Sequence, residues 1–340
     1  METDYKDNPH RRYNILTGEW VLCSPQRNKR PWQGKLEALA NNIRPKYVAE
    51  CFLCPNNNRI TGDVNPDYQA TYVFQNDFGA LLENTPDNVI NDNLLIAKSE
   101  RGICKVICFS PDHSLTIADM PKEAIVKVIE TWQKEYSDLR TIDWINHVQI
   151  FENKGEAMGC SNPHPHGQIW AQSSIPHEVA LKSLHQLDHY IDKSRSLLSD
   201  YLAHEMEAKE RIVFENDHFV GLVPFWAIWP FETMIIPKKH SPNILNMATE
   251  ENNAFAEVLK NITQKYDRLF DTPFPYSMGI HQSPTDGRDH NHWHWHVSFY
   301  PPLLRSAIIK KFMVGYEMFG EPQRDISAEY AANTLNNIII

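Results

Sequence analysis

Short runs rich in β-branched and aromatic residues are spaced along the chain and predict strands, because such side chains pack well on a pleated, half-buried surface. These runs are residues 71–82, 101–110, 147–155, 218–226 and 232–237. Amphipathic stretches, with apolar residues three and four positions apart, lie between them and predict helices. The pattern therefore indicates mixed α+β structure.

Two amphipathic stretches, residues 110–136 and 236–266, echo each other. Each passes from a strand end containing Pro and His, through a linker containing Met, into a helix that ends in Glu-Tyr or Lys-Tyr. A histidine-rich strand follows in both cases, HPHGQIWA in the first and HWHWHVSFY in the second. This similarity predicts a duplicated α+β unit.

The histidine spacing supports the duplication. His113 and His164 are 51 residues apart, and His240 and His292 are 52 apart. We read HNHWHWHV as the relic of a second copy, because the donor loop that precedes His164 has no counterpart there.

A charged, helical stretch, residues 177–211, joins the two copies. Apolar residues recur on one of its sides, at Leu184, Leu187, Ile191 and Leu198. This stretch predicts a long helical connector, and no Gly/Ser-rich linker separates the two copies. The predicted domains are residues 1–176 and 177–340, packed as one body.

Composition places the chain among ordinary globular proteins. Its 340 residues are 42% hydrophobic and carry a net charge of −10, which argues against a general nucleic-acid binder and against adhesion to anionic membranes. The N-terminal residues METDYKDNPHRRYN lack the apolar core of a signal peptide, and prolines and a glutamate interrupt the apolar residues 222–237. We therefore expect a soluble, cytoplasmic protein.

Six cysteines in so long a chain do not form a disulfide framework. Cys51 and Cys54 have the C-x-x-C spacing of metal ligands, and a closed zinc site needs two more ligands. His113, after a predicted strand, and His164 are the candidates. The alternative is that Cys51 and Cys54 are ordinary buried thiols, as we expect for Cys104 and Cys108 in an apolar strand.

The segment GCSNPHPHGQ, residues 159–168, combines a tight loop with two histidines. Pro165 keeps His164 extended, so the side chains of His164 and His166 should project to the same side. We expect the backbone N–H groups of 159–163 to be free to meet an anion. An isolated His-x-His is more often a polar turn, but Gly, Ser and Gln beside it each have a use next to a phosphoryl group.

Neutral imidazole is a good nucleophile near pH 7, since only one ring nitrogen carries a proton. If a carbonyl accepts the Nδ1 proton of His166, Nε2 is left free to attack. The loop and Gln168 point to phosphorus as the target, because donors there would stabilise developing negative charge. This chemistry is a covalent phospho- or nucleotidyl-histidine mechanism.

The sequence resembles the galactose-1-phosphate uridylyltransferase family of the histidine-triad superfamily. The matching stretches run nearly end to end: TGEWVLCSPQRNKRPWQG, CFLCPNNNRITGDVNPDY, VFQNDF, CFSPDH, FENKGEAMGCSNPHPHGQIWA, PFETMIIPKKH, FPYSMG and YPPLLRSAIIKKFMVGYEMFGEPQRD. The resemblance implies two histidine-triad-like halves, each an antiparallel sheet with flanking helices.

The resemblance also implies a two-step exchange. His166 would take UMP from UDP-glucose and release glucose 1-phosphate, and galactose 1-phosphate would then accept UMP from the histidine. Gln168 would bond the transferring phosphoryl group, and zinc would be held by Cys51, Cys54, His113 and His164. The implied substrate contacts are Asn153, Gly159, Cys160 and Ser161 for the phosphates, Asn76 and Asp77 for uridine, Arg27 and Arg30 for the diphosphate, and Lys311, Phe312, Val314, Tyr316, Glu317 and Gln323 for the sugar phosphate. Some would come from a partner subunit of a homodimer.

The sequence departs from the family at a second, iron-type site made of one glutamate and three histidines. The matching positions are Lys182, His281, His296 and Ser298. A lysine would repel an ion, so we expect this site to be empty, with Lys182 replacing the ion's charge. Glu178 and His294 are possible substitutes, since each should lie on the matching face.

Two other classes of protein share part of this pattern. A nucleotidyl hydrolase or phosphorylase of the same superfamily would use the same histidine, but KKFMVGYE and Gln168 fit a sugar phosphate better than water. A non-catalytic alternative is a zinc-stabilised nucleotide-binding or nucleic-acid module. The net charge of −10 and the lack of basic residues interleaved with aromatic ones argue against it.

Overall fold

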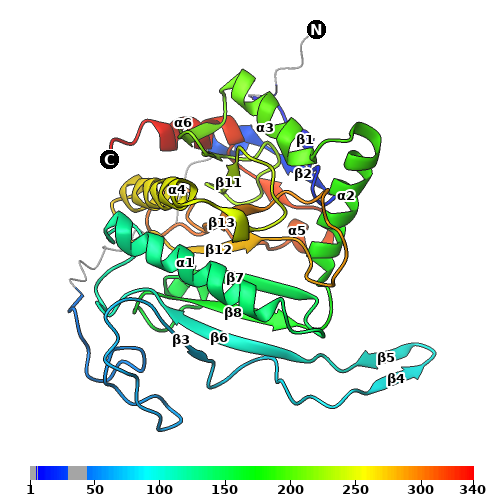
Figure 1. The fold of residues 1–340 in the computed structure, drawn as a ribbon. Coiled ribbons are helices and arrows are strands. Elements are labelled where there is room, and N and C mark those ends of the chain that lie inside the picture. The colour runs from blue at the N-terminus through cyan, green and yellow to red at the C-terminus, as the bar shows by residue number, and fades with distance from the viewer. Residues whose placement is uncertain (1–4, 6, 30–43) are drawn as a thin grey trace.

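The computed structural model describes residues 5, 7–29 and 44–340 (Figure 1). Its largest element is a nine-stranded sheet in which all neighbouring strands are antiparallel. Across the sheet the strands are β3 (Tyr72–Gln75), β6 (Gly102–Cys108), β8 (His166–Gln172), β7 (His147–Lys154), β12 (Tyr276–His281), β13 (His296–Tyr300), β11 (Thr233–Pro237), β10 (Phe219–Leu222) and β9 (Ile212–Glu215). The α+β prediction is confirmed.

The sheet is symmetric about the pair β7 and β12. On one side follow β8, β6 and β3, and on the other β13, β11 and β10. The duplicated units predicted from the sequence are thus edge-joined into one continuous sheet. Several strands are shorter than the runs that predicted them: β3 ends at Gln75 because the Asn76 side chain accepts the N–H of Phe78 and turns the chain.

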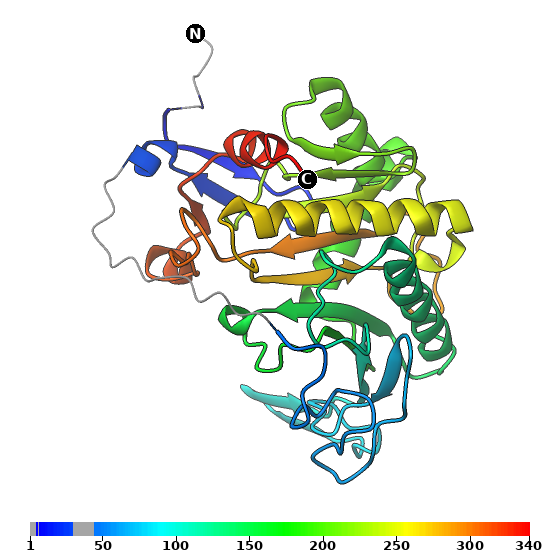
Figure 2. The ribbon, with the colours of Figure 1, turned by 90° about the vertical axis from the view of Figure 1, so that its left-hand side faces the viewer.

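Helices α1 (Lys122–Leu139) and α4 (Thr249–Leu269) lie side by side on one face of the sheet (Figures 1 and 2). Their apolar residues recur at helical spacing and are buried against the strands; they include Ile125, Val128, Ile129 and Trp132 in α1, and Phe255, Val258, Leu259 and Ile262 in α4. Core residues of β8 and β12 point to this face. The opposite face of these strands carries the polar side chains described below.

The histidines that mark the duplication also match in space. The rings of His113 and His164 lie 5.3 Å apart, and those of His240 and His294 lie 5.2 Å apart. His294 therefore takes the place of His164 in the second unit. The sequence spacing had pointed to His292, two residues earlier.

The predicted connector is helical, but it is divided into two helices. The chain forms two helices, α2 (His177–Lys193) and α3 (Leu197–Ala208), because Ser194 adopts a left-handed conformation with φ of 55°. Of the predicted apolar stripe, Leu198 is fully buried, whereas Leu184 and Ile191 are 51% and 72% exposed.

The remaining elements lie around this sheet. They are the small sheet of β1 (His10–Tyr13), β2 (Trp20–Cys23) and β14 (Gln323–Arg324), the hairpin β4 (Val89–Asp92) and β5 (Leu95–Lys98), helices α5 (Tyr316–Phe319) and α6 (Ala328–Asn336), and the 3-10 turns Pro25–Lys29, Glu156–Met158 and Ile244–Asn246. The hairpin projects away from the body (Figure 1). Within the described ranges, no helix has both the length and the apolar character needed to cross a membrane.

Candidate active site

The four predicted metal ligands, Cys51, Cys54, His113 and His164, come together. All are buried, and their ligand atoms lie within 4.8 Å of one another. Cys54 Sγ is 3.6 Å from Nδ1 of both histidines. A tetrahedral site with metal–sulfur and metal–nitrogen bonds of about 2.3 and 2.0 Å has sulfur–nitrogen edges of about 3.5 Å. The spacing therefore fits an ion bound by two sulfurs and two Nδ1 atoms.

The surroundings of these ligands also fit a cation. Nε2 of His164 is 2.9 Å from the carbonyl oxygen of Ser110, an arrangement that turns Nδ1 towards Cys54. Burial lowers the pKa of His164 to about 4, so the imidazole is neutral, as a ligand must be. Burial raises the pKa of Cys54 to about 11, and a bound cation would offset that penalty on the thiolate.

Asn162 connects this cluster to the loop before His166. Its Oδ1 accepts the backbone N–H of His164 at 3.0 Å, and its Nδ2 donates to Cys51 Sγ at 3.5 Å. The sequence reasoning missed this residue. An Asn two positions before a constrained residue is a typical turn signal and could have identified it.

His166 begins β8, where it lies on the sheet face opposite α1 and α4. Its Nδ1 lies 2.7 Å from the carbonyl oxygen of His164, so Nδ1–H donates to that oxygen and Nε2 keeps its lone pair. Burial lowers the pKa of His166, only partly opposed by this hydrogen bond. The ring is thus neutral at pH 7 and held in one tautomer.

A small cavity of about 120 Å³ lies beside this ring. It is lined by Asn153, Gly159, Cys160, Ser161, Asn162, His166, Gly167 and Gln168. Gly159 has φ of 78°, which other residues rarely adopt. A Cβ at Gly167 would lie 2.8 Å from the ring of Phe109, so any residue larger than glycine would clash with that ring. The structure therefore gathers the predicted nucleophile, Gln168 and all four predicted phosphate contacts.

The loop offers fewer backbone donors than predicted. The N–H groups of Gly159 and Cys160 bond to the carbonyls of Glu156 and Gly155, and that of His164 bonds to Asn162. Only the N–H groups of Ser161 and Asn162 have no partner among the described residues. Side-chain donors must therefore supply much of the polar lining.

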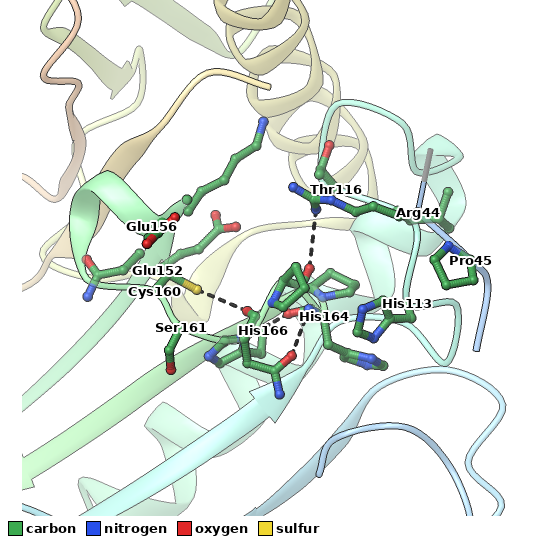
Figure 3. Close-up of a pocket in the computed structure, with 17 residues that line it drawn as sticks. Arg44, Pro45, His113, Thr116, Glu152, Glu156, Cys160, Ser161, His164 and His166 are labelled. Atoms are coloured by element: carbon green, nitrogen blue, oxygen red, sulfur yellow. Dashed lines mark hydrogen bonds between the residues drawn. The ribbon is translucent and has the colours of Figure 1, made fainter. Parts of the chain in front are cut away.

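A larger pocket of about 550 Å³ shares part of this loop (Figure 3). Arg44, His113, Glu152, Cys160 and His166 are among the residues on its walls. Glu152 was not predicted: it accepts a hydrogen bond from Tyr276 at 3.1 Å, and burial raises its pKa to about 7. The loop and the His166 ring therefore border both a small cavity and a larger one.

The predicted sugar-phosphate residues form a second group. Lys311 pairs with Glu317 at 2.5 Å, Glu317 accepts the N–H of Gln323 at 3.1 Å, and the predicted diphosphate contact Arg27 pairs with Asp325, beside Gln323. Phe312, Val314 and Tyr316 are exposed. None of these residues lines either pocket at His166.

The predicted uridine contacts follow the edge strand β3. Asp77 lies 3.3 Å from the guanidinium of Arg59, which stacks on Phe74 at 4.5 Å. Asn76 bonds to β6 through its backbone N–H. Arg30 lies outside the described residues.

The four positions of the second, iron-type site, which we expect to be empty, do not form a set of ligands that fits a metal ion. Lys182 Nζ lies 3.2 Å from Nδ1 of His281, whose ring stacks on His296 at 4.6 Å. Neither substitute completes a ligand set: Glu178 is exposed, and His294 bonds Ser196 and the carbonyl of Pro237. A lysine ammonium would repel a cation here.

Replacing Lys182 by Met is expected to stabilise the protein at neutral pH. Burial lowers the pKa of Lys182 to about 8, against about 10.4 in an unfolded chain. The folded state therefore disfavours the charged lysine below pH 8, and this cost disappears as the pH rises above 10.4. Allowing for the lost contact to His281, Lys182→Met should raise the unfolding free energy at pH 7 by about 2 kcal/mol.

Denaturant melts from pH 7 to 10 test this, with the exposed Lys193→Met on the same helix as control. The gain should shrink above pH 8. A loss of stability at pH 7 would show that the lysine is a stabilising group.

Comparisons with known proteins agree over the whole chain. The family model described as Galactose-1-phosphate uridyl transferase, N-terminal domain, matches residues 1–176, and that of the C-terminal domain matches residues 182–339. The galactose-1-phosphate uridylyltransferase of Haemophilus influenzae is 53% identical over 97% of this chain and 94% of its own length. That of Saccharomyces cerevisiae is 48% identical over 99% and 96%.

Solved structures share the fold. A uridylyltransferase structure aligns over 96% of this chain and 97% of its own, with a TM-score of 0.76 and 24% identity. An ADP-glucose phosphorylase from Arabidopsis thaliana, solved with bound ADP-glucose, aligns over 98% and 99%, with a TM-score of 0.78 and 24% identity. At this identity the likeness concerns the fold alone.

Proposed function

Because the chain belongs to the galactose-1-phosphate uridyl transferase family, and is therefore a nucleotidyltransferase, we propose that it transfers UMP from UDP-glucose to galactose 1-phosphate through a uridylyl-histidine on His166. One observation carries the assignment of His166. Its Nδ1–H is bonded to the carbonyl of His164, which leaves a nucleophilic Nε2 beside a cavity lined with donors.

The proposed first step is attack of the Nε2 lone pair on the α-phosphorus of UDP-glucose. A nitrogen–phosphorus bond forms, and the bond from the α-phosphorus to the bridging oxygen breaks, so that glucose 1-phosphate leaves with that oxygen. Positive charge grows on the imidazole, and the carbonyl of His164 stabilises it through Nδ1–H.

In the second step a phosphate oxygen of galactose 1-phosphate attacks the same phosphorus, and the nitrogen–phosphorus bond breaks. UDP-galactose leaves and neutral His166 is restored. Gln168 and Asn153 are assigned to the phosphoryl oxygens, together with Gly159, Cys160 and Ser161.

The other substrate contacts remain part of the proposal. Asn76 and Asp77 are assigned to uridine, and Arg27 and Arg30 to the diphosphate. The sugar phosphate is assigned to Lys311, Phe312, Val314, Tyr316, Glu317 and Gln323.

We propose zinc at Cys51, Cys54, His113 and His164, because two thiolates and two imidazoles in a closed tetrahedron are its usual donors. A zinc ion there would tie the 51–54 segment to the turn after β6 that carries His113 and to the loop before β8 that carries His164. Its role would be structural, since four protein ligands leave no open position.

A homodimer is also proposed, with active sites shared between subunits and with functional halves at residues 1–176 and 177–340. Two features support shared sites: the Lys311–Gln323 group lies outside the pockets at His166, and the hairpin β4–β5 exposes Leu95 and Ile96 by 70% and 69%. Sedimentation is expected to give twice the chain mass, and a monomer with full activity would contradict the proposal.

Isotope exchange tests the reaction. With UDP-glucose and labelled glucose 1-phosphate but no other sugar phosphate, label should enter UDP-glucose. Binding of UDP-glucose without exchange would contradict the transfer. UMP formed with water as the acceptor, or UDP formed once inorganic phosphate is added, with no UDP-galactose made from galactose 1-phosphate, would instead indicate the hydrolase or phosphorylase of the same superfamily.

A further inference from the structure

Two carboxamides line the phosphate cavity, and each has its oxygen bonded to a donor outside it. Trp170 Nε1 donates to Oε1 of Gln168 at 3.1 Å, and Ser277 Oγ donates to Oδ1 of Asn153 at 2.6 Å. Neither Trp170 nor Ser277 lines the cavity. Neither NH₂ group bonds another described residue, so NH₂ is the part of each amide left available to an anion in the cavity.

Both donors are placed by the sheet. Trp170 lies two residues after Gln168 on β8 and so projects to the same face. Its ring packs edge-on against Phe151, with centroids 5.6 Å apart, which fixes the indole N–H. Ser277 lies directly opposite Asn153 in the β12–β7 register, so this contact crosses between the two halves of the chain.

The orientation matters because an amide can present either a donor or an acceptor. An amide oxygen turned into the cavity would repel phosphoryl oxygens, whereas NH₂ would bond them. An indole nitrogen can only donate, so Trp170 stabilises one orientation of Gln168 and disfavours the reverse. Several backbone N–H groups of the loop 159–164 already bond to groups in or next to the loop. The amides of Gln168 and Asn153 therefore supply a large share of the hydrogen-bond donors available to an anion in the cavity.

We propose that Trp170 and Ser277 are positioning residues that turn the amides of Gln168 and Asn153 into a donor-only lining, and that this lining selects and holds the phosphoryl group in front of His166. The proposal rests on the proposed function for the reaction it serves. The orientation of the two amides affects anion binding, which can be measured separately from the transfer reaction.

Calorimetric titration with UMP measures anion binding without transfer. Trp170→Phe keeps the ring but removes the donor, and Ser277→Ala removes the hydroxyl; each should weaken UMP binding and slow single-turnover UMP transfer about fivefold to tenfold. Ser277→Thr, which keeps a hydroxyl, should restore most of both. Trp144→Phe, a half-buried tryptophan that stacks on Arg101 before β7, is the matched control and should change neither.

A double-mutant cycle separates positioning from general packing. In a Gln168→Ala background, Trp170→Phe should have no further effect, and Ser277→Ala should have none in an Asn153→Ala background. The inference would be overturned if Trp170→Phe or Ser277→Ala weakened UMP binding as much in these backgrounds as in the unchanged protein. It would also be overturned if the single variants bound and transferred UMP as well as the unchanged protein. A protein that binds UMP with this pattern of losses yet transfers none would instead overturn the proposed function.

Discussion

Replacing His166 by Asn is expected to abolish UMP transfer, with kcat lowered by on the order of 10⁵-fold. The reason is direct, because Nε2 of this ring is the atom assigned to attack phosphorus and the asparagine amide is not nucleophilic. The melting temperature should change little, since the ring is partly exposed and makes one hydrogen bond. Initial rates of isotope exchange measure the effect.

His218→Asn, in the turn between β9 and β10, is the matched control and should keep full activity. The pH profile gives a second check. Because burial lowers the pKa of His166, the exchange rate should stay constant as the pH falls from 7 to the ordinary histidine range, and decline only as it falls through the lowered pKa. A His166→Asn protein that retains a tenth of the rate would exclude a nucleophilic role.

Replacing Cys54 by Ala is expected to remove the metal and lower the unfolding free energy by about 4 kcal/mol or more. Cys54 is central because its sulfur is 3.6 Å from both histidine ligand atoms, and losing it opens the tetrahedron. UMP transfer should also fall, because the backbone of His164 holds the tautomer of His166. Metal analysis and melts with and without a chelator measure these effects.

Cys104→Ala on β6 is the control, since this thiol is also buried but lies outside the cluster. It should keep one metal per chain and lose about 1 kcal/mol, as expected for a small cavity. A Cys54→Ala protein that retains its metal and its stability would show that the four residues are ordinary packing.

The clustering of the four candidate metal ligands, and the place of His166 beside them, could be predicted because the sequence carries their signals locally. C-x-x-C spacing and a proline between two histidines constrain side chains over a few residues, and the structure brings Cys51, Cys54, His113 and His164 together. The duplication could be predicted from the paired stretches at 110–136 and 236–266, which became α1, α4 and the strands around them.

The features that could not be predicted from the sequence depend on contacts between residues far apart in the chain. The serine opposite Asn153 comes from β12, 124 residues later, and no local pattern marks it. The helical connector is interrupted at Ser194, and nothing in the neighbouring sequence strongly indicates that this residue adopts a left-handed conformation. In the second unit, the ring that contacts His240 belongs to His294 and not to His292. Residue spacing along the chain could not distinguish the two, because ring contact depends on where the strand begins.

The most direct test of a covalent transfer at His166 is mass spectrometry of the protein after mixing with UDP-glucose alone and quenching in base. The account predicts that the peptide containing His166 gains one uridylyl group, that glucose 1-phosphate is released in equal amount, and that galactose 1-phosphate then removes the label as UDP-galactose. An unmodified peptide from a protein that binds UDP-glucose and still makes UDP-galactose would contradict the covalent mechanism.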